Sequence, residues 1–190
     1  MSDLAIQPRC TALILIDLQR FIVGHPAAPY PTAEVVERSA ALAAAFRRKG
    51  ATVVYVRVDL ADMLSLPADR LFRDPNAPPP PPAASELVPE AGAQPGDLLI
   101  TKHQWGAFFG TDLEAQLRQR GIRTVVLTGV ATNFGVESTA RAAAGLGFEL
   151  IVAEDATTSI SAEAHRFAVE QIFPLLGRVR STAQLLDSLG

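Results

Sequence analysis

Residues 11–17 read Thr-Ala-Leu-Ile-Leu-Ile-Asp, an apolar run that ends at a carboxylate. Strands that are buried on both faces of a sheet are continuously apolar instead of alternating, so this run predicts an interior strand of a parallel sheet. Similar runs rich in Val, Ile and Leu follow at 52–58, 98–101, 124–128 and 148–152. A short sixth strand is expected at 178–180.

Helical patterns occupy the intervals between these runs. Three of them cover Thr32–Lys49, 111–120 and 134–146, and each stops at a glycine, namely Gly50, Gly121 and Gly147. Glycine just past a helix is the expected stop signal, because it adopts the left-handed conformation at little cost. Further helices are expected at 161–173 and 182–189. Alternating strands and helices indicate right-handed βαβ units and an α/β fold.

Residues 59–96 interrupt this alternation. The segment contains the five-proline run 78–82 and four other prolines, Pro67, Pro75, Pro89 and Pro95. Long irregular loops in compact domains are usually functional or disordered. The segment is therefore either a polyproline II stretch that crosses the surface or a lid over a site.

Composition limits the class of protein. With 190 residues, 48% hydrophobic and 19% charged residues, the chain has the size of one domain, taken as 1–190. A net charge of -3 and the lack of a Lys/Arg run argue against nucleic-acid or membrane partners and favour a small neutral or anionic metabolite. A membrane helix needs about 20 apolar residues, and the apolar runs are shorter, so a cytoplasmic location is expected.

The single cysteine, Cys10, excludes an internal disulfide and any zinc site built from cysteines. The three histidines, His25, His103 and His165, are far apart and lack metal-ligand spacing. No glycine motif for dinucleotides, nucleoside triphosphates or a serine nucleophile follows a predicted strand. We therefore expect neither a metal ion nor another cofactor.

Candidate catalytic groups follow the predicted strands. Ligands of open parallel sheets bind at the carboxyl ends of the strands, where Asp17, Asp59 and the Lys102–Trp105 stretch are expected. Burial would raise the pKa of Asp17 and a nearby Lys102 would lower it. Alternatively, Asp17 caps a turn and Lys102 is a solvated loop charge.

The loop 129–135 leads from a strand into a helix at the same edge. Thr132 or Asn133 is expected to cap that helix, with the amides near Phe134 and Gly135 facing a developing oxyanion or a ligand carboxylate. Glu137 and the arginine four residues later, Arg141, are interpreted as a structural ion pair.

Aromatic residues also gather at this edge. They could line an apolar pocket, although burial in the core is the common fate of aromatic side chains. The set consists of Phe21, Trp105, Phe108, Phe109 and Phe134.

On four stretches the chain resembles the isochorismatase-like hydrolases, also called cysteine hydrolases of the nicotinamidase type. The stretches are 12–21 (ALILIDLQRF), 101–113 (TKHQWGAFFGTDL), 127–141 (LTGVATNFGVESTAR) and 153–157 (AEDAT). The resemblance implies a three-layer α/β/α fold whose six-stranded parallel sheet has the order 3-2-1-4-5-6. It also implies a homodimer or a higher homo-oligomer.

The resemblance also implies roles for individual residues. Asp17 matches the catalytic aspartate, Lys102 the catalytic lysine, and Val130–Ala131 a non-proline cis peptide bond that shapes the oxyanion site. The residues that would contact substrate are Phe21, Trp105, Val130, Ala131, Asn133 and Phe134.

Two features depart from the family pattern. Gly135 stands where most members have the nucleophilic cysteine, and Cys10 precedes the first strand, toward the opposite end of the sheet. The metal-binding Asp and His cluster of nicotinamidases has no match after Asp59. Without a thiolate at position 135, amide hydrolysis through a thioester lacks its covalent step.

Three functional interpretations follow from Gly135. Isochorismatases also have glycine there and hydrolyse a vinyl ether, a reaction in which Asp17 would be the acid and Lys102 would hold a substrate carboxylate or tune that acid. The loop 129–135 itself is more similar to the cysteine enzymes. The alternatives are therefore a non-catalytic binding or regulatory protein, and an amidohydrolase inactivated by substitution at Gly135.

Overall fold

The structure is a computed structural model that describes residues 6–64, 66–72, 74 and 76–189. Its centre is a six-stranded sheet in which every neighbouring pair is parallel, with the order β3-β2-β1-β4-β5-β6. The strands are β1 (Thr11–Ile16), β2 (Thr52–Val58), β3 (Leu98–Lys102), β4 (Thr124–Val130), β5 (Glu149–Thr158) and β6 (Arg178–Arg180). The predicted fold class and strand order are confirmed.

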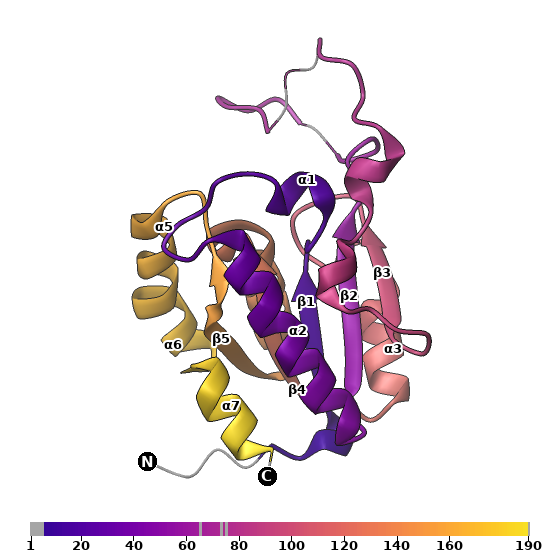
Figure 1. The fold of residues 1–190 in the computed structure, drawn as a ribbon, viewed down its shortest axis with the longest axis vertical. Helices are drawn as coiled ribbons and strands as arrows, with labels where there is room; N and C mark the ends of the chain where they lie inside the picture. Colours follow the sequence, from indigo (N-terminus) through magenta and orange to yellow (C-terminus); the bar gives the residue numbers. More distant parts are fainter. Residues whose placement is uncertain (1–5, 65, 73, 75, 190) are drawn as a thin grey trace.

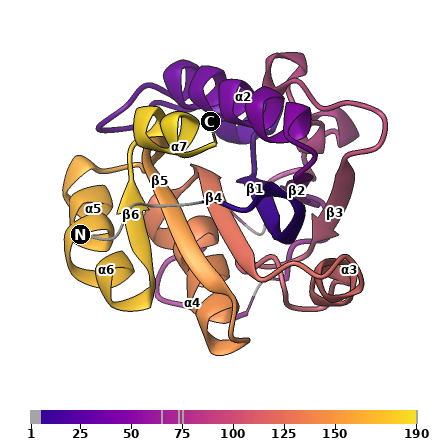
Figure 2. The ribbon, with the colours of Figure 1, turned by 90° about the horizontal axis from the view of Figure 1, so that it is seen from below.

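Helices cover both faces of the sheet and give three layers (Figure 2). The α-helices are α1 (Arg20–Val23), α2 (Thr32–Arg48), α3 (Leu113–Gln119), α4 (Glu137–Gly145), α5 (Ala162–Phe167), α6 (Phe173–Leu176) and α7 (Thr182–Ser188). Helices α2 and α7 lie on one face, and α3 to α6 lie on the other (Figure 2). The shorter helical turns are η1 (Pro8–Cys10), η2 (Pro82–Ser85), η3 (Pro89–Ala91) and two π-helical turns, η4 (Thr132–Val136) and η5 (Ala168–Ile172).

Strand β1 supplies side chains to both cores of the molecule. Successive side chains of a strand point to opposite faces. Leu13 and Leu15 therefore pack in the core beside α2, and Ile14 and Ile16 pack in the core beside α3 and α4; all four are fully buried. This two-sided burial explains the uninterrupted apolar run before Asp17.

The predicted helix ends are confirmed where glycine follows the helix. Gly50, Gly121 and Gly147 have φ values of 75°, 66° and 80°, the left-handed conformation that glycine tolerates best. After each of these glycines the chain enters the next strand, which is β2, β4 or β5 respectively.

The prediction that the fifth strand ends at residue 152 is wrong, because β5 continues to Thr158. Its pairing with β4 is irregular between Leu127 and Gly129, after which Thr157 and Thr158 pair with Gly129 and Val130. Both threonines are buried because their hydroxyls donate hydrogen bonds to backbone carbonyls. Because threonine is polar, the apolar pattern that predicts a strand does not extend to these two residues.

Two predicted helices are interrupted by π-helical turns. The helix predicted at 134–146 is instead η4 followed by α4, and the Val136 amide donates to the Ala131 carbonyl five residues earlier. The helix predicted at 161–173 consists of α5, η5 and α6 and ends at Leu176. Pro174 fits there because it lies in the first turn of α6, where a proline removes no helical hydrogen bond.

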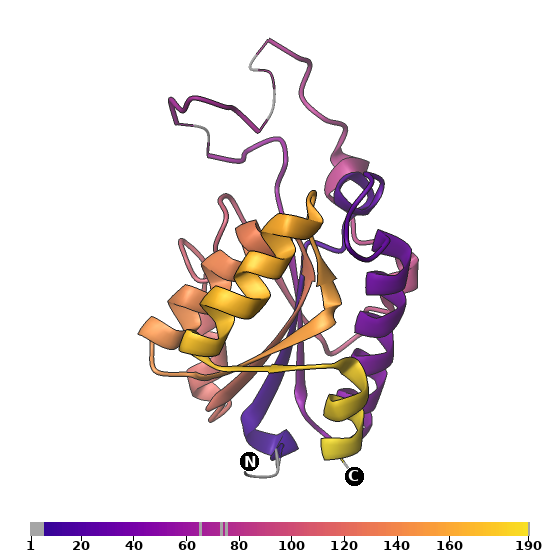
Figure 3. The same cartoon turned by 90° about the vertical axis from the view of Figure 1, so that its left-hand side faces the viewer.

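The proline-rich segment 59–96 extends beyond the carboxyl ends of the strands (Figures 1 and 3). Its closing part is fixed to the domain, since the Val88 amide donates to the Leu18 carbonyl and Leu87 pairs with Gln19. Positions 65, 73 and 75 of the segment lie outside the described residues. Within the described part of the chain, no helix has the length and apolar character required to cross a bilayer.

Candidate active site

Asp17 and Lys102 form a buried ion pair at the carboxyl edge of the sheet. Lys102 Nζ lies 2.8 Å from Asp17 Oδ2, and the two side chains are 1% and 9% exposed. Lys102 is the last residue of β3, so its interpretation as a solvated loop charge is wrong. Asp17 directly follows β1 and has φ 54°, an uncommon value for a non-glycine residue.

Burial and Lys102 act in opposite directions on the pKa of the Asp17 carboxyl group. Burial raises the pKa of its carboxyl group above 3.8, and the charge and hydrogen bond of Lys102 offset only part of this effect. Lys102 Nζ also donates to the Trp105 carbonyl at 2.8 Å. No donor or acceptor among the described residues reaches Asp17 Oδ1, which is buried. Since Lys102 donates to Oδ2, a proton on this carboxyl group resides on Oδ1.

Gly135, in η4, lies directly against this ion pair. A Cβ atom added to Gly135 would lie 3.0 Å from Lys102 Nζ, 3.1 Å from Asp17 Oδ2 and 3.1 Å from Ile16 Cγ2. The carboxyl ends of three strands, β1, β3 and β4, therefore bring together the three residues that the sequence singled out. Whatever side chain occupied position 135 would touch both members of the pair.

The only thiol of the chain belongs to Cys10, which lies in η1 immediately before β1, whereas Asp17 immediately follows that strand. Six residues of extended chain span about 20 Å. Arg123 Nη2 lies 3.2 Å from Cys10 Sγ at this amino end of the sheet. Cys10 is thus at the opposite end of the sheet from the Asp17–Lys102 pair.

The loop between β4 and α4 has a different hydrogen-bond pattern from the predicted one. Neither Thr132 nor Asn133 caps a helix, because η4 begins at Thr132 with Ala131 at its N-cap. The Thr132 hydroxyl is instead paired with His165 Nδ1 at 2.8 Å, and the Asn133 Oδ1 atom accepts from Ser159. The Phe134 amide donates to the Ala131 carbonyl at 3.1 Å, so it is not a free donor for a ligand.

Val130 and Ala131 are joined by a cis peptide bond. Val130 is buried in the core beside α2, and Ala131 packs against the same core. Their side chains are therefore used for packing, which leaves the backbone of this bond as the part that can contact a substrate.

Trp105 and Phe134 form an aromatic pair next to the ion pair. Their ring centroids are 5.1 Å apart, and the rings are 40% and 38% exposed. The ring of Phe72, from the proline-rich segment, meets Trp105 edge-on at 5.6 Å. Sequence reasoning missed Phe72, since an aromatic residue in an irregular segment gives no positional signal.

The other predicted aromatic residues are dispersed. Phe108 stacks on Phe148 and packs against the core beside α4, so of the two alternatives left open for it the core is correct. Phe21 lies on α1 with its ring against His25, and Phe109 is 63% exposed.

Gln19 is a further residue that sequence reasoning missed. It is fully buried, and its side-chain amide donates to the Val58 carbonyl and accepts from the Val58 amide, both at 2.8 Å. This double hydrogen bond joins the segment after β1 to the end of β2. Gln19 therefore helps to fix the backbone that carries Asp17.

Charged residues around the site have mainly structural partners. The predicted pair of Glu137 and Arg141 is confirmed, with Arg141 Nη2 2.8 Å from Glu137 Oε1. His103 Nδ1 lies 3.2 Å from an Asp62 carboxylate oxygen. Within the part of the chain that the structure describes, no three His, Cys, Asp or Glu side chains are grouped so as to hold a metal ion.

The parallel sheet order and the helices on both of its faces define a class of three-layer α/β proteins with solved members. An isochorismatase family protein from Burkholderia thailandensis has a TM-score of 0.89 and 44% identity, with 97% of each chain covered. Residues 11–184 match the family model described as Isochorismatase domain. The chain belongs to the isochorismatase family, whose members are hydrolases.

Curated relatives agree with this assignment. The uncharacterized isochorismatase family protein YecD of Escherichia coli O157:H7 is 45% identical over 198 residues, covering 98% of this chain and all of that protein. Ureidoacrylate amidohydrolase RutB of Pantoea ananatis is 40% identical over 106 residues, which cover 55% of this chain and 42% of that protein.

Proposed function

We propose that the protein hydrolyses a small anionic vinyl ether without a covalent enzyme intermediate, with Asp17 as the general acid. The observation that carries this proposal is the Asp17 carboxyl group, which is buried, has a raised pKa and leaves Oδ1 without a partner among the described residues. A carboxyl group whose pKa is raised keeps its proton to a higher pH and can act as a general acid.

The reaction starts with transfer of the Asp17 proton to the terminal carbon of the enol ether. The carbon–carbon double bond supplies the electron pair, the terminal carbon becomes a methyl group, and an oxocarbenium ion forms. Water then adds to the cationic carbon and returns one proton to Asp17. The resulting hemiketal collapses to an alcohol and a keto acid, so atoms and charge balance.

The Gly135 position favours this route over the thioester route. An enzyme thioester requires a thiolate beside the scissile carbonyl, and the only cysteine, Cys10, precedes β1 at the other end of the sheet. Glycine at position 135 instead lets the backbone of η4 approach the ion pair closely, since even a Cβ there would lie 3.0 Å from Lys102 Nζ. The amidohydrolase relative motivates amides as comparison substrates.

Lys102 has the role of tuning the acid in this proposal. Its ammonium group already donates to Asp17 Oδ2 and to the Trp105 carbonyl, which occupy two of its three N–H groups. The remaining N–H can contact a substrate carboxylate beside Gly135. Trp105 and Phe134 supply an exposed aromatic surface for the body of the substrate.

The test compares wild-type protein with Asp17→Asn on isochorismate, a vinyl ether dicarboxylate, and on a set of small amides. Asp187→Asn, an exposed aspartate on α7, is the matched control. We expect isochorismate turnover by wild type and by the control, and loss of turnover in Asp17→Asn with the fold intact by circular dichroism. No turnover by wild type would reject the proposal, and binding without turnover would favour a non-catalytic binding protein.

A further inference from the structure

Thr139 carries a buried hydroxyl group that joins two segments of the active site. Thr139 lies on α4 and is fully buried. Its hydroxyl donates to the Gly135 carbonyl at 2.7 Å and accepts from the Ala107 amide at 3.1 Å. Because the amide can only donate and the carbonyl can only accept, the direction of each hydrogen bond is fixed.

The bond from Ala107 distinguishes Thr139 from an ordinary helical threonine. A threonine in a helix commonly donates to the carbonyl four residues earlier, as Thr139 does to Gly135. The bond from Ala107 instead comes from a fully buried residue 32 positions away, in the loop between β3 and α3. In the same loop, a Cβ added to Gly106 would lie 3.6 Å from Ser138 Cβ. The loop after β3 thus packs directly on α4, and the Thr139 hydroxyl bonds it there.

Both segments joined by Thr139 lie next to Lys102. The first segment, residues 105–107, begins with the Trp105 carbonyl, which accepts from Lys102 Nζ at 2.8 Å. The second is η4, where a Cβ on Gly135 would lie 3.0 Å from the same Nζ atom. The distance between segment 105–107 and η4 therefore determines the surroundings of the ammonium group.

The same two segments carry the aromatic pair of the site. Trp105 belongs to segment 105–107 and Phe134 to η4, and their ring centroids are 5.1 Å apart. The spacing of the rings depends on how the two segments are held together. A change in that spacing would alter the surface available to the body of a substrate.

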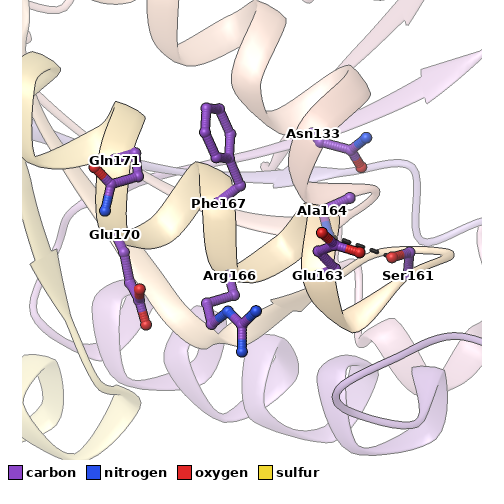
Figure 4. Close-up of a pocket in the computed structure, with 8 residues that line it drawn as sticks. All are labelled: Asn133, Ser161, Glu163, Ala164, Arg166, Phe167, Glu170 and Gln171. Carbon is purple, nitrogen blue, oxygen red and sulfur yellow. Dashed lines mark hydrogen bonds between the residues drawn. The ribbon is translucent and has the colours of Figure 1, made fainter.

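Other side-chain hydrogen bonds of η4 lead to a different part of the fold. Thr132 pairs with His165 on α5, and Asn133 accepts from Ser159, which follows β5. Asn133 also lines a cavity of about 510 Å³ together with residues of α5 and η5 (Figure 4). A segment beside a cavity has fewer packing contacts, so its position depends more on its hydrogen bonds. Of these bonds, the link through Thr139 leads toward the ion pair.

We propose that Thr139 is a positioning residue of the active site, whose hydroxyl holds segment 105–107 against η4 and so keeps Lys102 in place beside Asp17. When the hydroxyl is removed, the buried amide and carbonyl that it bonds lose this partner, which is unfavourable. Segment 105–107 is then expected to shift away from η4 and to carry the Trp105 carbonyl with it. The consequence for turnover rests on the proposed reaction, whereas the shift of the segment does not.

The test compares Thr139→Val, which keeps the shape of threonine but lacks the hydroxyl, with Thr139→Ser, which retains it. Trp105 is the only tryptophan of the chain, so its fluorescence reports on segment 105–107. In Thr139→Val we expect emission at longer wavelength and stronger quenching by acrylamide, because the ring becomes more exposed. Thr139→Ser should keep the wild-type spectrum.

Thr11→Val is the matched control. Thr11 is also buried, and its hydroxyl donates to the Gln7 carbonyl at 2.8 Å at the amino end of β1. This variant loses a hydrogen bond of the same kind at the opposite end of the sheet from the ion pair. Its Trp105 spectrum and its turnover should equal those of wild type.

Turnover of isochorismate is the second readout. Thr139→Val should lower kcat by at least about ten-fold, because reacting groups must be held closely in place. Thr139→Ser should restore most of the turnover. A wild type without turnover would reject the proposed reaction, and the Trp105 spectra would then decide the present inference alone.

Four results would overturn the inference. They are a wild-type Trp105 spectrum in Thr139→Val, an equal spectral shift in Thr11→Val, a Thr139→Ser variant that behaves like Thr139→Val, and full turnover in Thr139→Val despite a spectral shift. Circular dichroism verifies that each variant is folded. Thr139→Ala, which also lacks the hydroxyl, is measured in parallel and replaces Thr139→Val if the valine variant does not fold.

Discussion

Replacement of Gly135 by alanine tests whether the active site is built around the absence of a side chain. The new Cβ would lie 3.0 Å from Lys102 Nζ and 3.1 Å from both Asp17 Oδ2 and Ile16 Cγ2, all closer than ordinary van der Waals contact. Forcing an extra methyl group into a packed region costs about 1–3 kcal/mol. Glycine-to-alanine replacement returns about 0.4–1 kcal/mol by restricting the unfolded chain.

The net loss of unfolding free energy for Gly135→Ala is therefore about 0.5–2 kcal/mol, a decrease in Tm of about 2–6 °C for a chain of this length. Gly145→Ala is the matched control, because Gly145 belongs to α4 and a Cβ there meets no described atom within 4 Å. The control should raise Tm by about 1–3 °C. Differential scanning calorimetry measures both shifts.

Activity gives a second measure of the same substitution. Displacing the Asp17–Lys102 pair by a few tenths of an ångström should lower the turnover of the vinyl ether by at least about ten-fold, since reacting groups must be held closely in place. The reasoning is refuted if Gly135→Ala is as stable as Gly145→Ala and retains full turnover, because the close packing around Gly135 would then affect neither stability nor turnover.

Three further predictions concern the site and its supports. Because only protonated Asp17 can act as the acid, kcat/KM should fall about ten-fold per pH unit above the pKa of this group, which burial raises above 3.8; a rate that increases with pH in this range would contradict the assignment. Burial lowers the pKa of His165 below 6.5, so the unfolded chain binds the proton more tightly and the free energy of unfolding should decrease by up to about 1.4 kcal/mol per pH unit as the pH falls below 6.5. His165→Gln should remove that component, and an unchanged pH dependence in urea titrations would exclude it. Gln19→Leu should lower the free energy of unfolding by about 2–4 kcal/mol, because the Val58 amide and carbonyl lose their buried partners; a loss below about 0.5 kcal/mol in urea denaturation would show that the double hydrogen bond is unimportant.

The sheet and the three central residues could be predicted because their physical causes are local in the sequence. Two-sided burial produces continuous apolar runs, and the residue that ends each run arrives at the carboxyl edge. Asp17 and Lys102 are positioned in this way, Gly135 follows in η4 after β4, and the structure brings the three within contact distance. Gly50, Gly121 and Gly147 marked the turns because their left-handed backbone favours glycine.

The remaining features depend on contacts between distant segments. The Thr132 hydroxyl was expected to cap a helix, but it is paired with His165, 33 residues further along the chain. Thr157 and Thr158 are buried by hydrogen bonds that the sequence does not indicate. Phe108 turns to the core and Phe72 reaches Trp105, and neither outcome is encoded in the spacing of apolar residues.

The most direct test of the proposed mechanism is the turnover of isochorismate by the wild-type protein in D₂O, followed by mass spectrometry of the released keto acid. Proton transfer from Asp17 to the enol carbon predicts sustained turnover with one deuterium in the methyl group and a lower kcat than in H₂O. No keto acid, or release of the keto acid at the same rate by Asp17→Asn, would contradict acid catalysis by Asp17.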